Sequence, residues 1–286
     1  MINLISIKNV QKILKEHNFP IRKKYGQNFL VDENIMQRIV DTADLSPETL
    51  VLEIGPGLGS LTQRLADRAK EVVAIEIDEL LLPILNSTLA SYDNVQLIHA
   101  DALKYDWSKI FKPEAQVKIV SNLPYYITSP LLEKMIRAPF QVDTCVLLVQ
   151  KEVAQRMAAE AGTPSYGSLS VFIQSQAQVE YVATVSNNVF YPRPKIDSAI
   201  VRLGFDPQLK DKIANQEILE KVLRSVFGQR LKTLRNSLLN SPHIKIEKSK
   251  LEEIEEHLPF SLKIRGEQLS PDELVLLSNL IVQANL

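Results

Sequence analysis

The fold is decided by the stretch Leu50-Val51-Leu52-Glu53-Ile54-Gly55-Pro56-Gly57-Leu58-Gly59, in which an apolar run ends in a glycine-rich turn. Such a run, followed by a helical pattern, is typical of the first strand and helix of an open α/β sheet, where glycine lets the backbone approach a ligand closely. The turn alone does not identify that ligand, because nicotinamide and flavin cofactors use similar turns and a plain tight turn has the same pattern.

The pattern around this stretch predicts a parallel sheet with helices on both faces, because short β-branched runs alternate with longer helical patterns as far as about residue 150. We expect strands over 50–54, 72–77, 95–99, 117–121 and 144–149, with 179–185 and 199–205 closing the sheet as an antiparallel edge pair. We expect helices over 58–69, 78–89, 129–137, 151–159 and 168–177.

After Asp206 the strand pattern ends and helical patterns follow over 216–227, 231–239, 248–257 and 271–284. The sequence therefore predicts a Rossmann-like α/β domain over residues 1–206, with an N-terminal extension, and a small all-helical domain over residues 207–286. Both lengths suit independent cores.

Composition limits the class of protein. With 45% hydrophobic and 23% charged residues, and no apolar stretch near the roughly 20 residues of a membrane span, the 286-residue chain resembles a soluble globular protein. The N-terminus lacks a secretory pattern, so we expect a cytoplasmic protein. We also expect a monomer. The single cysteine, Cys145, lies in an apolar run, and the four histidines have no ligand-like spacing, so we expect no metal.

A net charge of −1 means that any affinity for nucleic acid must come from local basic patches. One patch is Arg22-Lys23-Lys24, and the other is a stretch of 15 residues without an acid that contains Lys221, Arg224, Arg230, Lys232 and Arg235. Lys232 and Arg235 are three apart in an expected helix and so should share a face. A solvated helix face is the alternative interpretation.

Polar residues at the ends of the expected strands indicate a cofactor site. Glu76 ends the second strand, 21 residues after Gly55, where a carboxylate can accept both hydrogen bonds of a ribose diol. Asp101 follows the third strand and could accept from an adenine amino group. The alternatives are a surface acid for Glu76 and a helix cap for Asp101.

After the fourth strand the chain reads Asn122-Leu123-Pro124-Tyr125. If Asn122 Oδ1 and the Leu123 carbonyl accept the two hydrogens of a base amino group, the nitrogen can leave planarity and free its lone pair for attack. Tyr125 would stack on the base. The alternative is a turn with a core tyrosine. Together with Gly55, Gly57, Glu76 and Asp101, this motif has the spacing of S-adenosylmethionine-dependent methyltransferases.

Seven segments in order resemble the ribosomal RNA adenine dimethyltransferase family, and especially its bacterial small-subunit enzymes. They are Lys24-Tyr25-Gly26-Gln27-Asn28-Phe29-Leu30, Glu53 to Gly59, Glu76-Ile77-Asp78, Asn122-Leu123-Pro124-Tyr125, Gln150-Lys151-Glu152-Val153-Ala154, Phe190-Tyr191-Pro192-Arg193-Pro194-Lys195-Ile196-Asp197-Ser198-Ala199, and Gln229-Arg230-Leu231-Lys232-Thr233-Leu234-Arg235-Asn236. One departure is Leu231, where many relatives carry a basic residue.

The resemblance implies that Asn28 and Leu30 contact the methionine and ribose side of S-adenosylmethionine, where they join Gly55, Glu76, Asp101 and Asn122. It implies that Phe190 stacks on the base opposite Tyr125. From the residues alone, Phe190 would be a core or strand-edge residue. It also implies transfer of four methyl groups to two adjacent adenosines in the 3′-terminal hairpin of 16S rRNA, in the small ribosomal subunit or a late precursor. The alternatives are a methyltransferase of large-subunit RNA and a non-catalytic assembly or RNA-binding factor.

Overall fold

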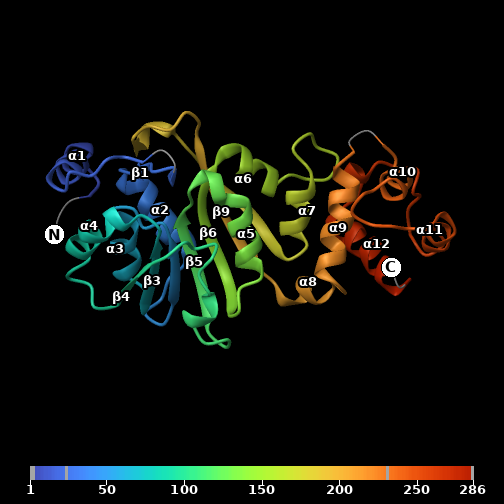
Figure 1. The fold of residues 1–286 in the computed structure, drawn as a ribbon, viewed down its shortest axis with the longest axis horizontal. Helices are drawn as coiled ribbons and strands as arrows, with labels where there is room; N and C mark the ends of the chain where they lie inside the picture. Colours follow the sequence, from blue (N-terminus) through green and yellow to red (C-terminus); the bar gives the residue numbers. More distant parts are fainter. Residues whose placement is uncertain (1–3, 23–24, 230–231, 285–286) are drawn as a thin grey trace. The chain divides into compact units, whose positions relative to one another are not determined.

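The computed structural model describes residues 4–22, 25–229 and 232–284, which form two compact units (Figure 1). The first unit consists of Met1–Ala154 and Glu180–Gly204, and the second of Gln155–Val179 and Phe205–Leu286. Residues 155–179 therefore pack with the C-terminal helices, whereas the sequence interpretation placed them with the sheet. The functional division at residue 206 stays a prediction.

A mixed seven-stranded sheet forms the centre of the first unit, with the order β4-β3-β2-β5-β6-β9-β7. Strands β4, β3, β2, β5 and β6 pair in parallel, and β9 pairs antiparallel to β6. Their bounds are β2 Leu50–Ile54, β3 Glu71–Glu76, β4 Val95–His99, β5 Gln116–Asn122, β6 Gln141–Gln150, β7 Ala177–Val185 and β9 Ser198–Phe205. All seven predicted strands are confirmed, as is the Rossmann-like class.

Helices cover this sheet, and the predicted ones are present, with α5 shifted by one residue and the others shorter (Figure 1). The bounds are α3 Ser60–Ala66, α4 Leu82–Thr88, α5 Thr128–Ile136 and α6 Lys151–Met157. Two helices, α1 Ile7–Glu16 and α2 Glu33–Ala43, precede the first sheet strand and had no sequence prediction. The Asp32 side chain caps α2 by accepting from the Ile35 N–H, which satisfies one of the helix's unpaired donors.

The N-terminal extension is joined to a later part of the chain by a two-stranded sheet. Strand β1, Phe29–Leu30, pairs antiparallel with β8, Phe190–Tyr191, so that Leu30 lies opposite Phe190. Both residues lie in a buried cluster with Met36, Ile39 and residues of β2, β5 and β6. Burying this much apolar surface fixes the extension against the sheet.

The second unit is helical. Its elements are α7 Ser168–Gln174, α8 Pro207–Asp211, α9 Gln216–Phe227, α10 Leu234–Leu239, α11 Lys248–Glu255 and α12 Pro271–Gln283. Helix α9 packs against α7, α10 and α12. Tyr166 meets the Phe227 ring edge-on, with 5.9 Å between the centroids, and its hydroxyl donates to the Leu269 carbonyl. Among the described residues, no helix is long and apolar enough to span a membrane.

Candidate active site

A pocket lies at the carboxyl ends of the parallel strands, where loops of an open α/β sheet form ligand sites. Its walls come from the turn after β2, the ends of β3 and β4, the turn after β5, and the N-terminal segment Tyr25–Leu30. The structure brings the following predicted residues together around it: Asn28, Leu30, Gly55, Gly57, Glu76, Asp101, Asn122, Leu123 and Tyr125. Phe190 is absent from this lining.

The glycine turn has the backbone conformation that the sequence required. Gly55 and Gly57 have φ angles of 73° and 61°, in the left-handed region that other residues rarely adopt. A Cβ atom on Gly57 would lie 3.1 Å from Cδ1 of Phe29, so a larger residue would displace the wall of the pocket. The turn therefore keeps the backbone open toward a ligand.

Glu76 lies at the end of β3 with its side chain inside the pocket wall, and is 5% exposed. Its Oε1 atom accepts from the Asp78 N–H at 2.8 Å. Burial raises the pKa of Glu76 to about 7, although hydrogen bonds from the N–H groups of Asp78, Ile77 and Gly57 lower it in part. The predicted position of this carboxylate at the strand end is consistent with a ribose acceptor.

Glu53, at the fourth position of β2, is a second buried carboxyl group that the sequence interpretation missed as a site residue. It is 1% exposed, and within the described residues its Oε2 atom has no hydrogen-bond partner. Burial, with a smaller contribution from the charge of Glu76, raises the pKa of Glu53 to about 8. An acid inside an otherwise apolar strand was the signal that could have identified it.

Asp101 follows β4 and lines the pocket. Its Oδ1 atom accepts from the Leu103 N–H at 2.9 Å, and its Oδ2 atom lies 3.8 Å from Lys104 Nζ. The residue therefore stabilises a turn after β4, where the alternative interpretation expected a helix, and it also contributes to the wall of the pocket.

Asn122, the last residue of β5, is held by the N-terminal segment. Its Nδ2 atom donates to the Asn28 carbonyl at 3.2 Å, and Asn28 Nδ2 donates in turn to the Gly26 carbonyl at 3.0 Å. Because its nitrogen donates this hydrogen bond, the Asn122 amide presents Oδ1 as an acceptor. The Leu123 N–H donates to the Leu148 carbonyl at 3.0 Å, which fixes the backbone of the motif to β6.

Tyr125 is half-buried at the pocket, and its hydroxyl lies 2.6 Å from Ser198 Oγ. The adjacent Tyr126 is 52% exposed. Phe190 is only 2% exposed and packs in the core with Leu30. A ring that stacks on a base needs an uncovered face, so the location of Phe190 agrees with the core interpretation, and its stacking role stays a prediction.

Arg22 is bound inside the first unit instead of facing solvent freely. Its Nη1 atom lies 3.1 Å from Oδ1 of the fully buried Asp78, whose Oδ2 atom accepts from Gln27 Nε2 at 2.7 Å. We therefore assign Arg22 to holding the N-terminal segment over the pocket, in place of the predicted phosphate contact. Lys23 and Lys24 lie outside the described residues.

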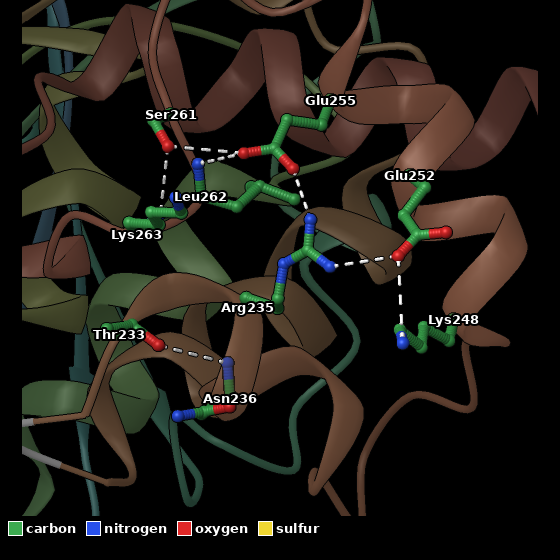
Figure 2. A network of polar contacts seen from close by, with 9 residues as sticks. All are labelled: Thr233, Arg235, Asn236, Lys248, Glu252, Glu255, Ser261, Leu262 and Lys263. Atoms are coloured by element: carbon green, nitrogen blue, oxygen red, sulfur yellow. Dashed lines mark hydrogen bonds and ion pairs between the residues drawn. The ribbon is translucent and has the colours of Figure 1, made fainter.

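Arg235 in α10 is likewise bound within the second unit (Figure 2). Its guanidinium contacts Glu252 at 3.2 Å and also Glu255, whose other oxygen accepts from the Leu262 N–H at 2.9 Å. The side chain thus joins α10 to α11 and to the loop after it. A phosphate would have to compete with two carboxylates, and the RNA contact of Arg235 stays a prediction.

The other basic residues of the second unit are more accessible. Lys232 is exposed, and Arg224 is 57% exposed, with its Nη2 atom 3.6 Å from Glu220. Helix α10 begins at Leu234, so the prediction that Lys232 shares a helix face with Arg235 is wrong; Thr233 caps the helix and ends the preceding turn. Arg230 lies outside the described residues.

The residues that line the pocket fit S-adenosylmethionine. The open glycine turn leaves room for backbone contact, Glu76 and Asp101 supply acceptors at two strand ends, and Glu53 has an unpaired buried oxygen. A ligand with ribose hydroxyls and positive charge matches these acceptors. Among the described residues there is no group of three or more potential metal ligands.

The chain matches a protein-family model and several named proteins over most of its length. A family model described as ribosomal RNA adenine dimethylase matches residues 18–270. The chain is 44% identical over 279 residues to a protein of Bacillus pumilus named ribosomal RNA small subunit methyltransferase A, with 96% of each chain covered. It is 43% identical over 274 residues to a protein of the same name from Geobacillus sp., with 94% of each covered.

Solved structures show the same architecture. A dimethyladenosine transferase from Plasmodium falciparum superposes with a TM-score of 0.79 at 26% identity, covering 90% of this chain and 98% of that one. The 23S rRNA methyltransferase ErmE superposes with a TM-score of 0.67 at 29% identity, covering 90% of this chain and all of the other.

Proposed function

Because the chain belongs to the ribosomal RNA adenine dimethylase family, whose members use S-adenosylmethionine, we propose that its substrate is 16S rRNA in the small ribosomal subunit or a late precursor. It transfers four methyl groups to the amino groups of two adjacent adenosines in the 3′-terminal hairpin. Curated relatives named for the small subunit, matching nearly the whole chain at 43 to 44% identity, support this choice over large-subunit RNA. The similarity to ErmE is lower, at 29%.

The cofactor's sulfonium supplies an already activated methyl group, so this chain has mainly to align the reacting atoms and exclude water. Gly55 and Gly57 would let the protein backbone approach the bound cofactor closely, and Glu76 would accept from its ribose hydroxyls. Asp101 receives the adenine amino group, and Asn28 and Leu30 close the site from the N-terminal segment.

The observation that carries the proposal is the hydrogen bond that fixes the orientation of the Asn122 amide. Its nitrogen is bound to the Asn28 carbonyl, which directs Oδ1 to accept a hydrogen from the adenine amino group. The Leu123 carbonyl accepts the other hydrogen. As the amino nitrogen becomes tetrahedral these hydrogen bonds strengthen, so they stabilise the transition state more than the bound substrate.

Tyr125 stacks on the extruded adenine, which stabilises the flipped base by about 1 to 3 kcal/mol. Its ring is half-buried at the same strand end as Asn122, so the base plane and the amino acceptors belong to one turn of the chain. Phe190 stacks on the other side of the adenine only if RNA binding exposes its ring, which is buried in this structure.

RNA docking is assigned to basic residues of the two patches found in the sequence. We assign phosphate contacts to Lys232 and Arg224 among the described residues, and to Lys23, Lys24 and Arg230 outside them. Residues 1–206 then act as the methyltransferase domain and residues 207–286 as the RNA-binding domain. The enzyme acts as a monomer in the cytoplasm, where small-subunit particles are its partner.

The test is Asn122→Ala. At saturating S-adenosylmethionine it should lower the rate of methyl transfer by about 10²- to 10³-fold, as removal of a transition-state donor or acceptor does elsewhere. Asn86→Ala, which alters an exposed asparagine of α4, is the matched control and should retain full activity. Unimpaired transfer by a folded Asn122→Ala protein would favour the binding-factor alternative or another catalytic group.

A further inference from the structure

The Tyr125 hydroxyl is bound at its far end by a residue that no part of the proposed chemistry uses. Ser198 Oγ lies 2.6 Å from Tyr125 Oη, and Ser198 is fully buried. Tyr125 itself lies in the short 3₁₀ turn Tyr125–Ile127, and the hydroxyl is the one polar group of its side chain. The hydroxyl contact is therefore the polar restraint on the direction of the ring.

Ser198 is held rigidly. It begins β9 and lies opposite Gln150 at the end of β6. The preceding residue, Asp197, accepts from the Asn187 N–H through Oδ1 and from the Lys151 N–H through its carbonyl, both at 3.0 Å. Backbone groups from three places in the chain thus fix the position from which Ser198 reaches Tyr125.

The same segment also holds the N-terminal part of the pocket. Leu30 pairs with Phe190, and the Val31 N–H donates to the Val189 carbonyl at 2.9 Å. Residues 187–198, which we call the brace, therefore contact both the segment that closes the cofactor side and the tyrosine on the substrate side. This geometry connects the two halves of the site, through a backbone hydrogen bond at Val31 and through the hydroxyl pair at Tyr125.

We propose that Ser198 is a positioning residue that orients the Tyr125 ring for stacking on the target adenine. The inference rests on the proposed function, since it concerns how the same site holds its base. The hydroxyl pair fixes the direction of the ring's long axis before the base arrives, so less side-chain freedom is lost when the base stacks. Loss of the pair leaves the ring present but less often correctly directed.

A double-mutant cycle tests the proposal, with Ser198→Ala, Tyr125→Phe and the double variant assayed on small-subunit particles. Each single variant should lower kcat about three- to tenfold, as expected for one lost hydrogen bond, without changing affinity for S-adenosylmethionine. The double variant should be no slower than either single variant, because each removes the same interaction. Tyr125→Ala should be far slower.

A second readout separates positioning from a general structural role. RNA carrying 2-aminopurine in place of a target adenosine should show weaker stacking-dependent fluorescence quenching with Ser198→Ala and Tyr125→Phe, and equally so. Tyr125→Phe removes the bond from the accessible side and keeps the buried serine, which guards against misfolding of Ser198→Ala. Ser129→Ala, at an exposed serine of α5, is the control and should behave as wild type.

Multiplicative losses in the double variant, or wild-type quenching in either single variant, would overturn the proposal and leave Ser198 as a core residue of β9. Failure of the proposed function would look different, because Asn122→Ala would then remain active or small-subunit particles would not be methylated by the wild type. Each result therefore reports on one of the two claims.

Discussion

Glu53→Gln should remove a pH dependence from the stability of the cofactor-free protein. The Glu53 pKa is raised from 4.5 to about 8 in the folded state by burial. Between these two values the folded protein binds more protons than the unfolded chain, so the free energy of unfolding falls as the pH rises. Glutamine has nearly the same size and does not titrate, so this contribution disappears in the variant.

The magnitude follows from the two pKa values. With a pKa of about 8 in the folded protein and 4.5 in the unfolded chain, raising the pH from 6 to 9 should cost the wild type about 2 to 3 kcal/mol more than Glu53→Gln. The comparison uses the change between two pH values, so a constant effect of the buried glutamine amide cancels. Titrating groups that do not interact with Glu53 are common to both proteins and cancel as well.

Urea denaturation followed by Trp107 fluorescence is a suitable assay. Trp107 is the single tryptophan, is buried, and lies in the first unit with Glu53, so it reports unfolding of the relevant core. The control is Glu114→Gln, at an exposed glutamate before β5, which should keep the wild-type pH dependence. An identical change from pH 6 to pH 9 in wild type and Glu53→Gln would refute the buried-carboxyl account.

Further outcomes concern the cofactor and RNA. Glu76→Ala should weaken S-adenosylmethionine binding about 10- to 100-fold by calorimetry, because ribose hydroxyls lose a charged acceptor; wild-type affinity in a folded variant would remove Glu76 from the site. Ionised carboxylates are the better acceptors, and the pKa of Glu76 is about 7. Affinity for S-adenosylmethionine should therefore fall about tenfold from pH 9 to pH 6, and binding at pH 7 should release protons. Proton uptake on binding, measured in buffers of different ionisation enthalpy, would contradict this. Lys232→Ala should reduce the salt dependence of subunit binding by about 0.7 to 0.9 in log–log slope. Arg235→Ala should leave that slope unchanged and lower the denaturation midpoint of the second unit; the reverse pattern would restore Arg235 to the RNA surface.

The strands of the sheet could be predicted from the sequence because each one depends on a local pattern. Each apolar run of β2, β3 and β5 ends in a glycine, acid or amide, and parallel strands bring those ends to one edge. The helices α1 and α2 had no prediction because they precede the alternating strand and helix pattern that begins at residue 50. The amphipathic pattern of α1, with Val10, Ile13 and Leu14 buried, was available as a signal.

The roles of several charged residues could not be predicted because their partners are distant in sequence. Arg22 pairs with Asp78, 56 residues away, and Arg235 with Glu252 and Glu255 from another helix. Charge counts identify where basic residues cluster but not which of them are neutralised inside the fold. The raised pKa of Glu53 depends in the same way on burial that only the assembled sheet provides.

Methyl transfer to purified ribosomal particles tests the central claim most directly. Wild-type protein and Asn122→Ala would be incubated with labelled S-adenosylmethionine and with small- or large-subunit particles that lack the modification, and the methylated nucleosides would be mapped and counted. The account predicts four methyl groups on two adjacent adenosines near the 3′ end of the small-subunit RNA, with Asn122→Ala nearly inactive. Methylation of large-subunit RNA instead, or none on either particle by a wild type that binds the cofactor, would contradict it.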